Sequence, residues 1–179
     1  MQNFHFYQET ERLILRSPLA EDAALLAAQR STDFVTRYNL YRPCDAAQIQ
    51  GELEAYQHII LVLKEENRVF GCVSIREDYL RHRVDARSLQ AWLPEEMAYQ
   101  GYMAEAVDAI LAYLLLEGVC ERVSVQIFAD NRASIRLAEK LGFEREGYLK
   151  RAVKNHLGQV FDVVLFSMDE ETYRKKKTQ

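Results

Sequence analysis

Two predicted helix starts in the middle of the chain carry residue types that can bind phosphates and amides. Gly101 stands directly before an amphipathic segment, and Asn131 and Ser134 stand at the beginning of a second one. The first N–H groups of a helix have no partner inside the helix, and a glycine lets a ligand approach the backbone closely. Each start is therefore either a binding site or only a turn or cap, which is the commoner role of such residues.

The elements around these residues follow from the spacing of apolar side chains. Within residues 103–115 apolar residues recur at spacings of three and four, which predicts a helix that ends near Gly118. Residues 122–128 alternate and predict a strand, and residues 87–93 predict the strand that precedes the helix. Together they predict a β-α-β unit. A second helix follows it and ends at Gly142.

Three stretches of the chain carry a family resemblance. They are Gly101-Tyr102-Met103-Ala104-Glu105-Ala106, the segment Asp130-Asn131-Arg132-Ala133-Ser134-Ile135 with Glu139-Lys140-Leu141-Gly142-Phe143, and Glu11-Arg12-Leu13-Ile14-Leu15-Arg16. Over residues 9–169 the chain resembles the GNAT superfamily of acetyl-coenzyme A-dependent N-acetyltransferases, most of all the branch that acetylates the N-termini of ribosomal proteins. The resemblance implies one α/β (α+β) domain over residues 1–179. Its mixed, mostly antiparallel sheet would have six or seven strands, a central β-α-β crossing and helices on both faces.

The resemblance also implies an activity and the residues that carry it. The protein would transfer an acetyl group from acetyl-coenzyme A, a co-substrate, directly to a primary amine such as a protein or peptide N-terminus or an amino acid. Ser134 would assist the departing thiolate, and an N–H near Trp92 or Leu93 would polarise the thioester carbonyl. The residues expected at the cofactor are Trp92, Leu93, Gln100, Gly101, Tyr102, Met103, Ala104, Asn131, Ser134 and Lys140.

Three positions depart from the family pattern. The pyrophosphate loop of the family begins with Gln or Arg and carries a further glycine, whereas this chain has Glu96 and Tyr99 at these positions. Many N-terminal acetyltransferases also have a tyrosine where this chain has Ala138. These departures support an alternative, a coenzyme A-binding module of the same fold with little or no turnover. A nucleotide-binding protein is a weaker alternative, because no Gly-Lys-Ser/Thr follows Gly101.

The flanking segments complete the predicted sheet and its helices. Further strands are expected over residues 11–17, 58–64, 69–76, 144–153 and 159–168. Gly71 indicates a bulge in one of them. Helices are expected over residues 20–30 and from Asp45 to about Tyr56. Tyr38 and Tyr41 lie between these helices, either as packing residues or as contacts to the acceptor.

Length and composition exclude several classes of protein. The 179 residues suit one domain, 49% are hydrophobic and 28% charged, and the net charge of −4 argues against a general nucleic-acid binder. Three cysteines without a CxxC pair suit a reducing cytoplasm. We expect a cytoplasmic protein without a metal or membrane partner. A homodimer is common in families of this kind, and the basic run 174–177 is expected to be a solvated terminus.

The general base and the acceptor are weakly determined by the sequence. Glu77, Asp78, Glu95 and Glu146 lie near strand ends, although solvation is the commoner role of such residues, and no base is assigned. Segments expected beside the acceptor carry an excess of positive charge: Arg76, Arg81, Arg83, Arg87 and Lys154 against Glu77, Asp78 and Asp85. Either these are scattered surface charges, or they favour an α-amine flanked by carboxylates over a polyamine.

Overall fold

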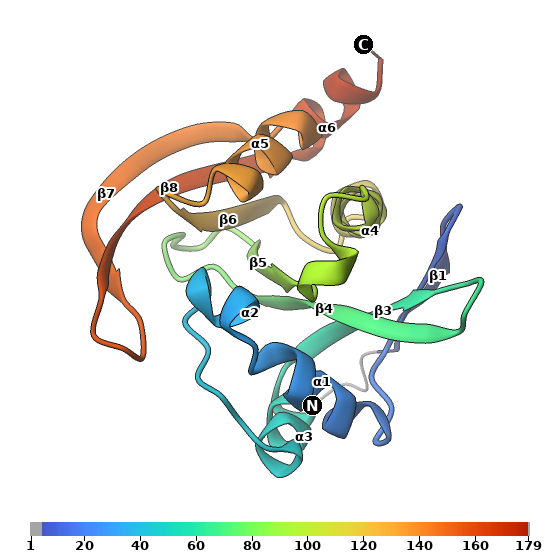
Figure 1. Ribbon diagram of the computed structural model, residues 1–179. Helices are drawn as coiled ribbons and strands as arrows, with labels where there is room; N and C mark the ends of the chain where they lie inside the picture. The colour runs from blue at the N-terminus through green and yellow to red at the C-terminus, as the bar shows by residue number, and fades with distance from the viewer. Residues whose placement is uncertain (1–4, 179) are drawn as a thin grey trace. The chain divides into compact units, whose positions relative to one another are not determined.

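The chain forms two compact units. The computed structural model describes residues 5–178 (Figure 1). The first unit consists of the residues up to Ile75 together with Ala91–Val107, and the second consists of Arg76–Gln90 together with the residues from Asp108 onward. Within residues 5–178, the helices are all too short or too polar to cross a membrane. That the whole chain acts as one domain stays a prediction.

The first unit contains an antiparallel sheet covered by three helices. Its strands pair in chain order: β1 (Tyr7–Glu9), β2 (Leu13–Arg16), β3 (Gln57–Leu63) and β4 (Arg68–Glu77). The helices α1 (Asp22–Arg30), α2 (Asp33–Arg37) and α3 (Ala46–Ala55) lie between β2 and β3 in the sequence. Helices α1 and α3 lie side by side (Figure 1).

Apolar side chains from these helices and strands form one core together with Trp92. It includes Ala23, Leu26, Ala27, Val35, Ile49, Ile60, Val62, Cys72 and Trp92. The members from α1 recur at spacings of three and four, so they share one face of that helix. Helix α3 begins with a capping box in which Asp45 accepts a hydrogen bond from the Gln48 N–H and Gln48 accepts one from the Asp45 N–H. The start that the sequence predicts at Asp45 is therefore confirmed.

The second unit contains the parallel crossing and a long hairpin. Its strand order is β5 (Ala86–Trp92), β6 (Arg122–Phe128), β8 (Val160–Asp169) and β7 (Glu144–Lys154). The last two residues of β5, Ala91 and Trp92, belong to the first unit. Strands β5 and β6 are parallel, whereas β6–β8 and β7–β8 are antiparallel. Strands β7 and β8 form a long, curved hairpin (Figure 1).

Helix α4 makes the crossover of the predicted β-α-β unit. Between β5 and β6 the chain passes through the 3₁₀ turn η1 (Glu95–Met97) and α4 (Tyr102–Leu111), which continues as the π-helical turn η2 (Ala112–Leu116). Helix α5 (Arg132–Leu141) follows β6 and ends at Gly142, whose φ of 88° is left-handed. The mixed, mostly antiparallel α/β fold is confirmed, since the seven expected strands all form and the short β1 is added to them.

The bulge expected at Gly71 is also present. Leu61 pairs with Gly71, but Val62 pairs with Val69, so Phe70 is the additional residue of β4. A Cβ at Gly71 would lie 2.7 Å from the carbonyl oxygen of Trp92, at the end of β5. The glycine thus permits a close backbone approach at this point of the first unit.

The C-terminus contains a helix that the sequence analysis does not predict. Residues 174–177 are exposed, as expected for a solvated terminus, but they belong to α6 (Glu170–Lys177). Asp169 caps this helix through the Thr172 N–H, acidic residues occupy its first turn and basic residues its last, as the helix dipole favours. Lys177 also pairs with Asp108 at 2.6 Å. The sequence signal for this helix is the cap Asp169 with Glu170 and Glu171 directly before the basic run.

Alanine at Gly71 should destabilise the protein, whereas alanine at Gly51 should not. At Gly71 the new Cβ would meet backbone, and such overpacking costs about 1–3 kcal/mol. Gly51 lies inside α3 with no atom within 4 Å of its Cβ position, so alanine there should stabilise by roughly 0.5–1 kcal/mol through helix propensity. Thermal unfolding of both variants measures the difference. Equal melting temperatures would contradict the close approach at Gly71.

Candidate functional site

The start of α4 presents a row of unpaired backbone N–H groups. Before it, η1 is closed by hydrogen bonds of 3.0 Å from the N–H groups of Met97 and Ala98. Gly101 then turns the chain with a φ of 84°. Within residues 5–178, no group accepts a hydrogen bond from the N–H groups of residues 101–104. These are the donors that a helix start leaves free for an anion.

Tyr99 has a left-handed backbone conformation. Its φ is 61°, and its side chain is 84% exposed. The left-handed region costs a residue with a Cβ about 1–2 kcal/mol. Because the exposed ring buries little surface, the surrounding loop must impose this conformation. The loop therefore has a conformation at this position that a glycine would also allow.

A group of hydrogen bonds ties the start of α4 to the segment before β2. Glu105 accepts one from the Thr10 hydroxyl (2.5 Å), one from the Arg12 N–H (2.8 Å) and one from Arg12 Nε (2.7 Å). Arg12 Nη1 donates to the carbonyl of Gln100 (3.0 Å), and the guanidinium lies 4.4 Å from the ring centre of Tyr102. Burial acts to raise the pKa of Glu105, but the hydrogen bonds from Thr10 and Arg12 outweigh it and lower that pKa.

Strand β5 pairs with β6 only over its first residues. The parallel pairs join Ala86, Arg87 and Ser88 to Arg122, Val123 and Ser124. Strand β6 continues beside β8 along its whole length. Leu89 therefore lies beyond the residues of β5 that pair with β6, as expected if the later part of β5 is to pair with a ligand.

Asn131 and Ser134 lie together at the start of α5. The Oδ1 atom of Asn131 accepts a hydrogen bond from the Ser134 N–H (3.1 Å), so Asn131 is the cap. The Ser134 hydroxyl has no partner within residues 5–178, and the side chain is half-buried. The hydroxyl is therefore not used for capping. Lys140 is exposed in the last turn, about 13 Å from Asn131 along the helix axis.

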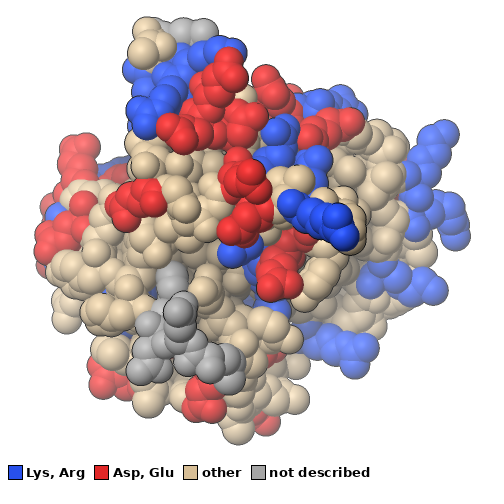
Figure 2. All heavy atoms as spheres, turned by 180° about the vertical axis from the view of Figure 1, so that it is seen from behind, with Lys and Arg blue, Asp and Glu red and all other residues tan. Residues whose placement is uncertain are grey.

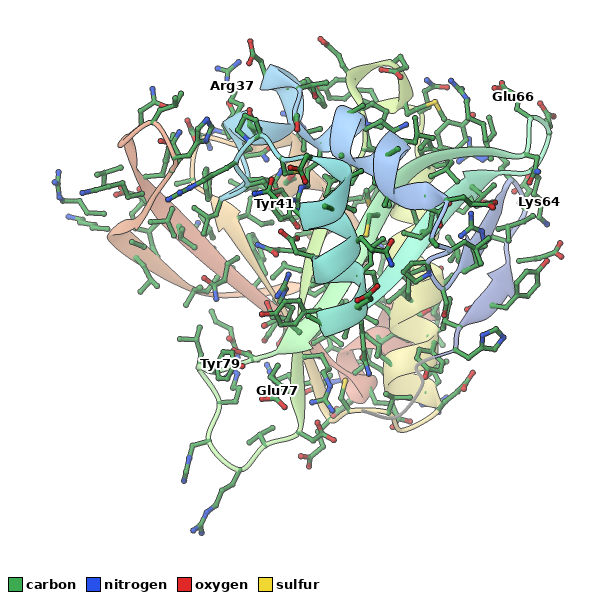
Figure 3. All side chains as sticks on the ribbon, turned by 90° about the horizontal axis from the view of Figure 1, so that it is seen from below. Arg37, Tyr41, Lys64, Glu66, Glu77 and Tyr79 are labelled. Carbon is green, nitrogen blue, oxygen red and sulfur yellow. The ribbon has the colours of Figure 1, made fainter. Side chains whose placement is uncertain are left out.

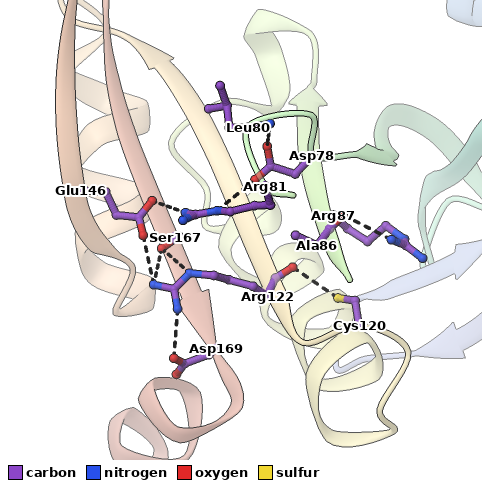
Figure 4. A network of polar contacts seen from close by, with 10 residues as sticks. All are labelled: Asp78, Leu80, Arg81, Ala86, Arg87, Cys120, Arg122, Glu146, Ser167 and Asp169. Atoms are coloured by element: carbon purple, nitrogen blue, oxygen red, sulfur yellow. Dashed lines mark hydrogen bonds and ion pairs between the residues drawn. The ribbon is translucent and has the colours of Figure 1, made fainter. Parts of the chain in front are cut away.

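Two of the four candidate bases belong to a polar network in the second unit (Figure 4). Glu146 pairs with Arg81 and with Arg122 (3.1 Å), and Arg122 also donates to the hydroxyl of Ser167 (2.7 Å). Burial acts to raise the pKa of Glu146, but hydrogen bonds from Ser167 and Arg81 and the arginine charges lower it overall. A carboxylate with a lowered pKa is a weak base.

The other candidate bases are buried or solvated. Asp78 is buried, with its Oδ1 atom accepting a hydrogen bond from the Leu80 N–H (2.9 Å) and its Oδ2 atom 3.6 Å from Arg81. Glu77 and Glu95 are exposed. Of these four carboxylates, Asp78 and Glu146 have hydrogen-bond or ion-pair partners within residues 5–178, and the partners of both include Arg81.

Ion pairs with carboxylates also neutralise part of the positive charge that is expected beside the acceptor. Arg81 pairs with Glu146, and Arg87 pairs with Asp85. Basic side chains do gather along the edge of the molecule that holds the β7–β8 hairpin (Figure 2). Strand β7 contributes Arg145, Lys150, Arg151 and Lys154, which are all exposed.

The packing role of Tyr41 is supported in the first unit. Tyr41 lies beside α3 (Figure 3), it packs against the core, and the guanidinium of Arg30 lies 4.5 Å from its ring centre. A hollow of about 360 Å³ lies beside α3 and is also lined by Arg30 and residues 42–44. None of the predicted site residues lines it. Within residues 5–178, no three His, Cys, Asp or Glu side chains are grouped to hold a metal ion.

Each unit thus brings together a different part of the predicted site. In the first unit, residues 100–104 form the loop and the start of α4, while the Trp92 side chain is 6% exposed and belongs to the core. In the second, the cap joins Asn131 to Ser134. Sequence reasoning missed Thr10 and Arg12, which lie about ninety positions from their partners. No spacing rule links positions so far apart.

Known proteins share this fold and sequence pattern. A family model described as "Acetyltransferase (GNAT) domain" matches residues 12–144. An uncharacterised N-acetyltransferase of Bacillus subtilis, YoaA, is 26% identical over 172 residues, which span 89% of this chain and 94% of the relative.

Two solved structures extend the comparison. The ribosomal-protein-S5-alanine acetyltransferase of Vibrio fischeri superposes with a TM-score of 0.82 at 20% identity, covering 94% of this chain and 98% of that one. The ribosomal L7/L12 α-N-protein acetyltransferase RimL, in complex with coenzyme A, gives a TM-score of 0.79 at 17% identity, covering 91% and 97%. At such identities the two structures establish the fold.

Proposed function

The chain belongs to the acetyltransferase (GNAT) family, and we propose that its acceptor is the α-amine of a peptide or protein N-terminus. The family establishes an enzyme that moves an acetyl group from acetyl-coenzyme A to an amine. The proposal therefore concerns the kind of amine and the residues that serve it.

The proposal rests on the contacts and burial of the candidate bases. Glu146 pairs with two arginines, and its pKa is lowered. Asp78 is buried beside Arg81. Neither is suited to remove a proton from a strongly basic amine. An α-amine has a pKa of about 7.7–8.0, whereas a lysine-like amine has one of about 10.4, so far more of the α-amine is neutral without help. Two structural neighbours are named as ribosomal-protein acetyltransferases, one of them as an α-N-protein acetyltransferase, which agrees with this choice.

The proposed reaction is a direct transfer. The neutral amine attacks the thioester carbonyl, a C–N bond forms and the C–S bond breaks. The attacking nitrogen loses one proton and the sulfur, which leaves as a thiolate, gains one, so that an amide and a thiol result. We assign Ser134 to the thiolate as a hydrogen-bond donor, because its hydroxyl is free and near the cap of α5. A backbone N–H near Trp92 or Leu93 would stabilise the negative charge that forms on the carbonyl oxygen.

The proposed cofactor residues fall into two sets. Backbone N–H groups of residues 101–104, after Gln100, would bind the pyrophosphate of coenzyme A, and Asn131 would orient the pantetheine arm. Lys140 stays a prediction, supported only by its exposure. The left-handed Tyr99 supports retention of the loop despite the missing glycine. A homodimer and a cytoplasmic location also stay predictions from the sequence.

Thiol release from acetyl-coenzyme A across a panel of amines tests the proposed acceptor. An acidic N-terminal peptide should give a higher kcat/KM than spermidine. Its advantage should shrink at high salt if the basic residues near β7 contribute, because salt screens exposed charges. A clear preference for spermidine would contradict the α-amine proposal. Binding of acetyl-coenzyme A without thiol release from any amine would favour the alternative of a binding module with little turnover.

Ser134→Ala should lower kcat and leave stability nearly unchanged. The hydroxyl has no partner in the described part of the chain, so its loss breaks no hydrogen bond there. If it serves only the thiolate, kcat should fall with little change in cofactor affinity. Asn131→Ala, by contrast, should lose about 1 kcal/mol of stability, because it removes the cap of α5. An unchanged kcat in Ser134→Ala would reject the catalytic role.

A further inference from the structure

We propose that Arg12 binds the pyrophosphate of coenzyme A and supplies the positive charge that the loop before α4 lacks. The inference rests on the cofactor site proposed at the start of α4. Arg12 lies outside that loop in the sequence, next to β2. Both Arg12 and residues 91–107 belong to the first unit.

The side-chain charges of the loop itself disfavour the binding of an anion. Between Leu93 and Ala104 it contains two acidic residues, Glu95 and Glu96, and no Lys, Arg or His. Unpaired N–H groups at a helix start amount to roughly half a positive charge. That half charge must attract a pyrophosphate group against two nearby carboxylates. A full positive charge beside the helix start would resolve this conflict.

Arg12 is held at that place by three of its contacts. Its Nε atom is bonded to Glu105, its Nη1 atom to the Gln100 carbonyl, and its guanidinium lies on the ring of Tyr102. A side chain fixed in this way has already lost the rotamer freedom that binding would otherwise cost. Arg12 therefore resembles a preorganised donor more than a mobile surface arginine.

One edge of the guanidinium remains available for a ligand. The Nη2 atom has no partner in residues 5–178, and it lies 3.3 Å from the position of a Cβ on Gly101. The side chain is 40% exposed. A phosphate oxygen bound at the N–H groups after Gly101 would thus find an arginine N–H beside it. Such charge-assisted hydrogen bonds to phosphate are among the stronger ones in proteins.

Glu105 does not remove this capacity. Its two oxygens already accept hydrogen bonds from Thr10 and from two N–H groups of Arg12. The carboxylate therefore fixes the Nε edge of the guanidinium and leaves the N–H groups of Nη2 able to donate hydrogen bonds to a ligand. Lysine could not replace Arg12, because one ammonium group cannot serve Glu105, the Gln100 carbonyl and a phosphate in the same geometry.

Calorimetric titration with coenzyme A and with dephospho-coenzyme A tests the proposal on wild-type protein and Arg12→Gln. Both ligands contain the pyrophosphate, so both dissociation constants should rise by at least about tenfold in the variant. Acetyl-pantetheine lacks the pyrophosphate. Its kcat/KM, with an amine that the wild type accepts, should change by less than about twofold, because only pyrophosphate-dependent binding is lost.

Arg68→Gln is the matched control. Arg68 has the same side chain and a similar exposure of 42%, it pairs with Glu66, and it contacts the same loop at Met97 instead of Gly101. The net charge changes equally in the two variants, so Arg68→Gln should weaken coenzyme A binding by less than about threefold if position matters more than charge. Equal losses in both variants would overturn the assignment to Arg12.

The outcomes separate this inference from the proposed function. If the wild type binds no coenzyme A, the cofactor site itself is wrong. If the wild type binds it and Arg12→Gln binds equally well, only the role of Arg12 is wrong. Equal losses with coenzyme A and acetyl-pantetheine would show that Arg12 is merely structural. Should Arg12→Gln fail to fold, Arg12→Lys replaces it, and undiminished binding of coenzyme A by Arg12→Lys would overturn the proposal.

Discussion

The hydrogen bonds that Glu105 accepts from Thr10 and Arg12 are the constraint on which the first unit's part of the site depends. They join the first turn of α4 to the segment before β2, and through Arg12 they also hold the carbonyl of Gln100. The free N–H groups of residues 101–104 are useful only if that turn is fixed, since a fraying helix start would present no defined donors. The lowered pKa of Glu105 means that the carboxylate stays charged at neutral pH and keeps these bonds.

Two backbone features near this turn fit the same interpretation. Tyr99 is held in a left-handed conformation although it has a Cβ, and Gly71 lets β4 come close to the carbonyl of Trp92. Strained or crowded backbone persists where the surrounding contacts require it. In the second unit the corresponding fixed point is the cap of α5, where Asn131 satisfies the Ser134 N–H and leaves the Ser134 hydroxyl free.

Sequence reasoning reached the elements because their signals are local. Apolar spacing, the cap at Asn131 and the turn at Gly142 depend on residues a few positions apart, so β6, α4 and α5 lie where they are expected. The contact of Arg12 with Gln100 depends on tertiary packing and has no local signal. The same limit applies to the bases. The sequence places Glu146 near the end of a strand, but only the structure shows that two arginines hold it. Helix α6 is not predicted for a different reason. Its signal combines the cap at Asp169 and acidic residues in the first turn with basic residues in the last turn, and the basic run alone does not indicate a helix.

A crystal structure of the protein with coenzyme A would test the central claim most directly, because it would locate the pyrophosphate. The account predicts that pyrophosphate oxygens lie within hydrogen-bond distance of N–H groups in residues 101–104, with Nη2 of Arg12 on one of them. Pyrophosphate bound elsewhere, with these N–H groups facing solvent and Arg12 in contact only with Glu105, Gln100 and Tyr102, would contradict it.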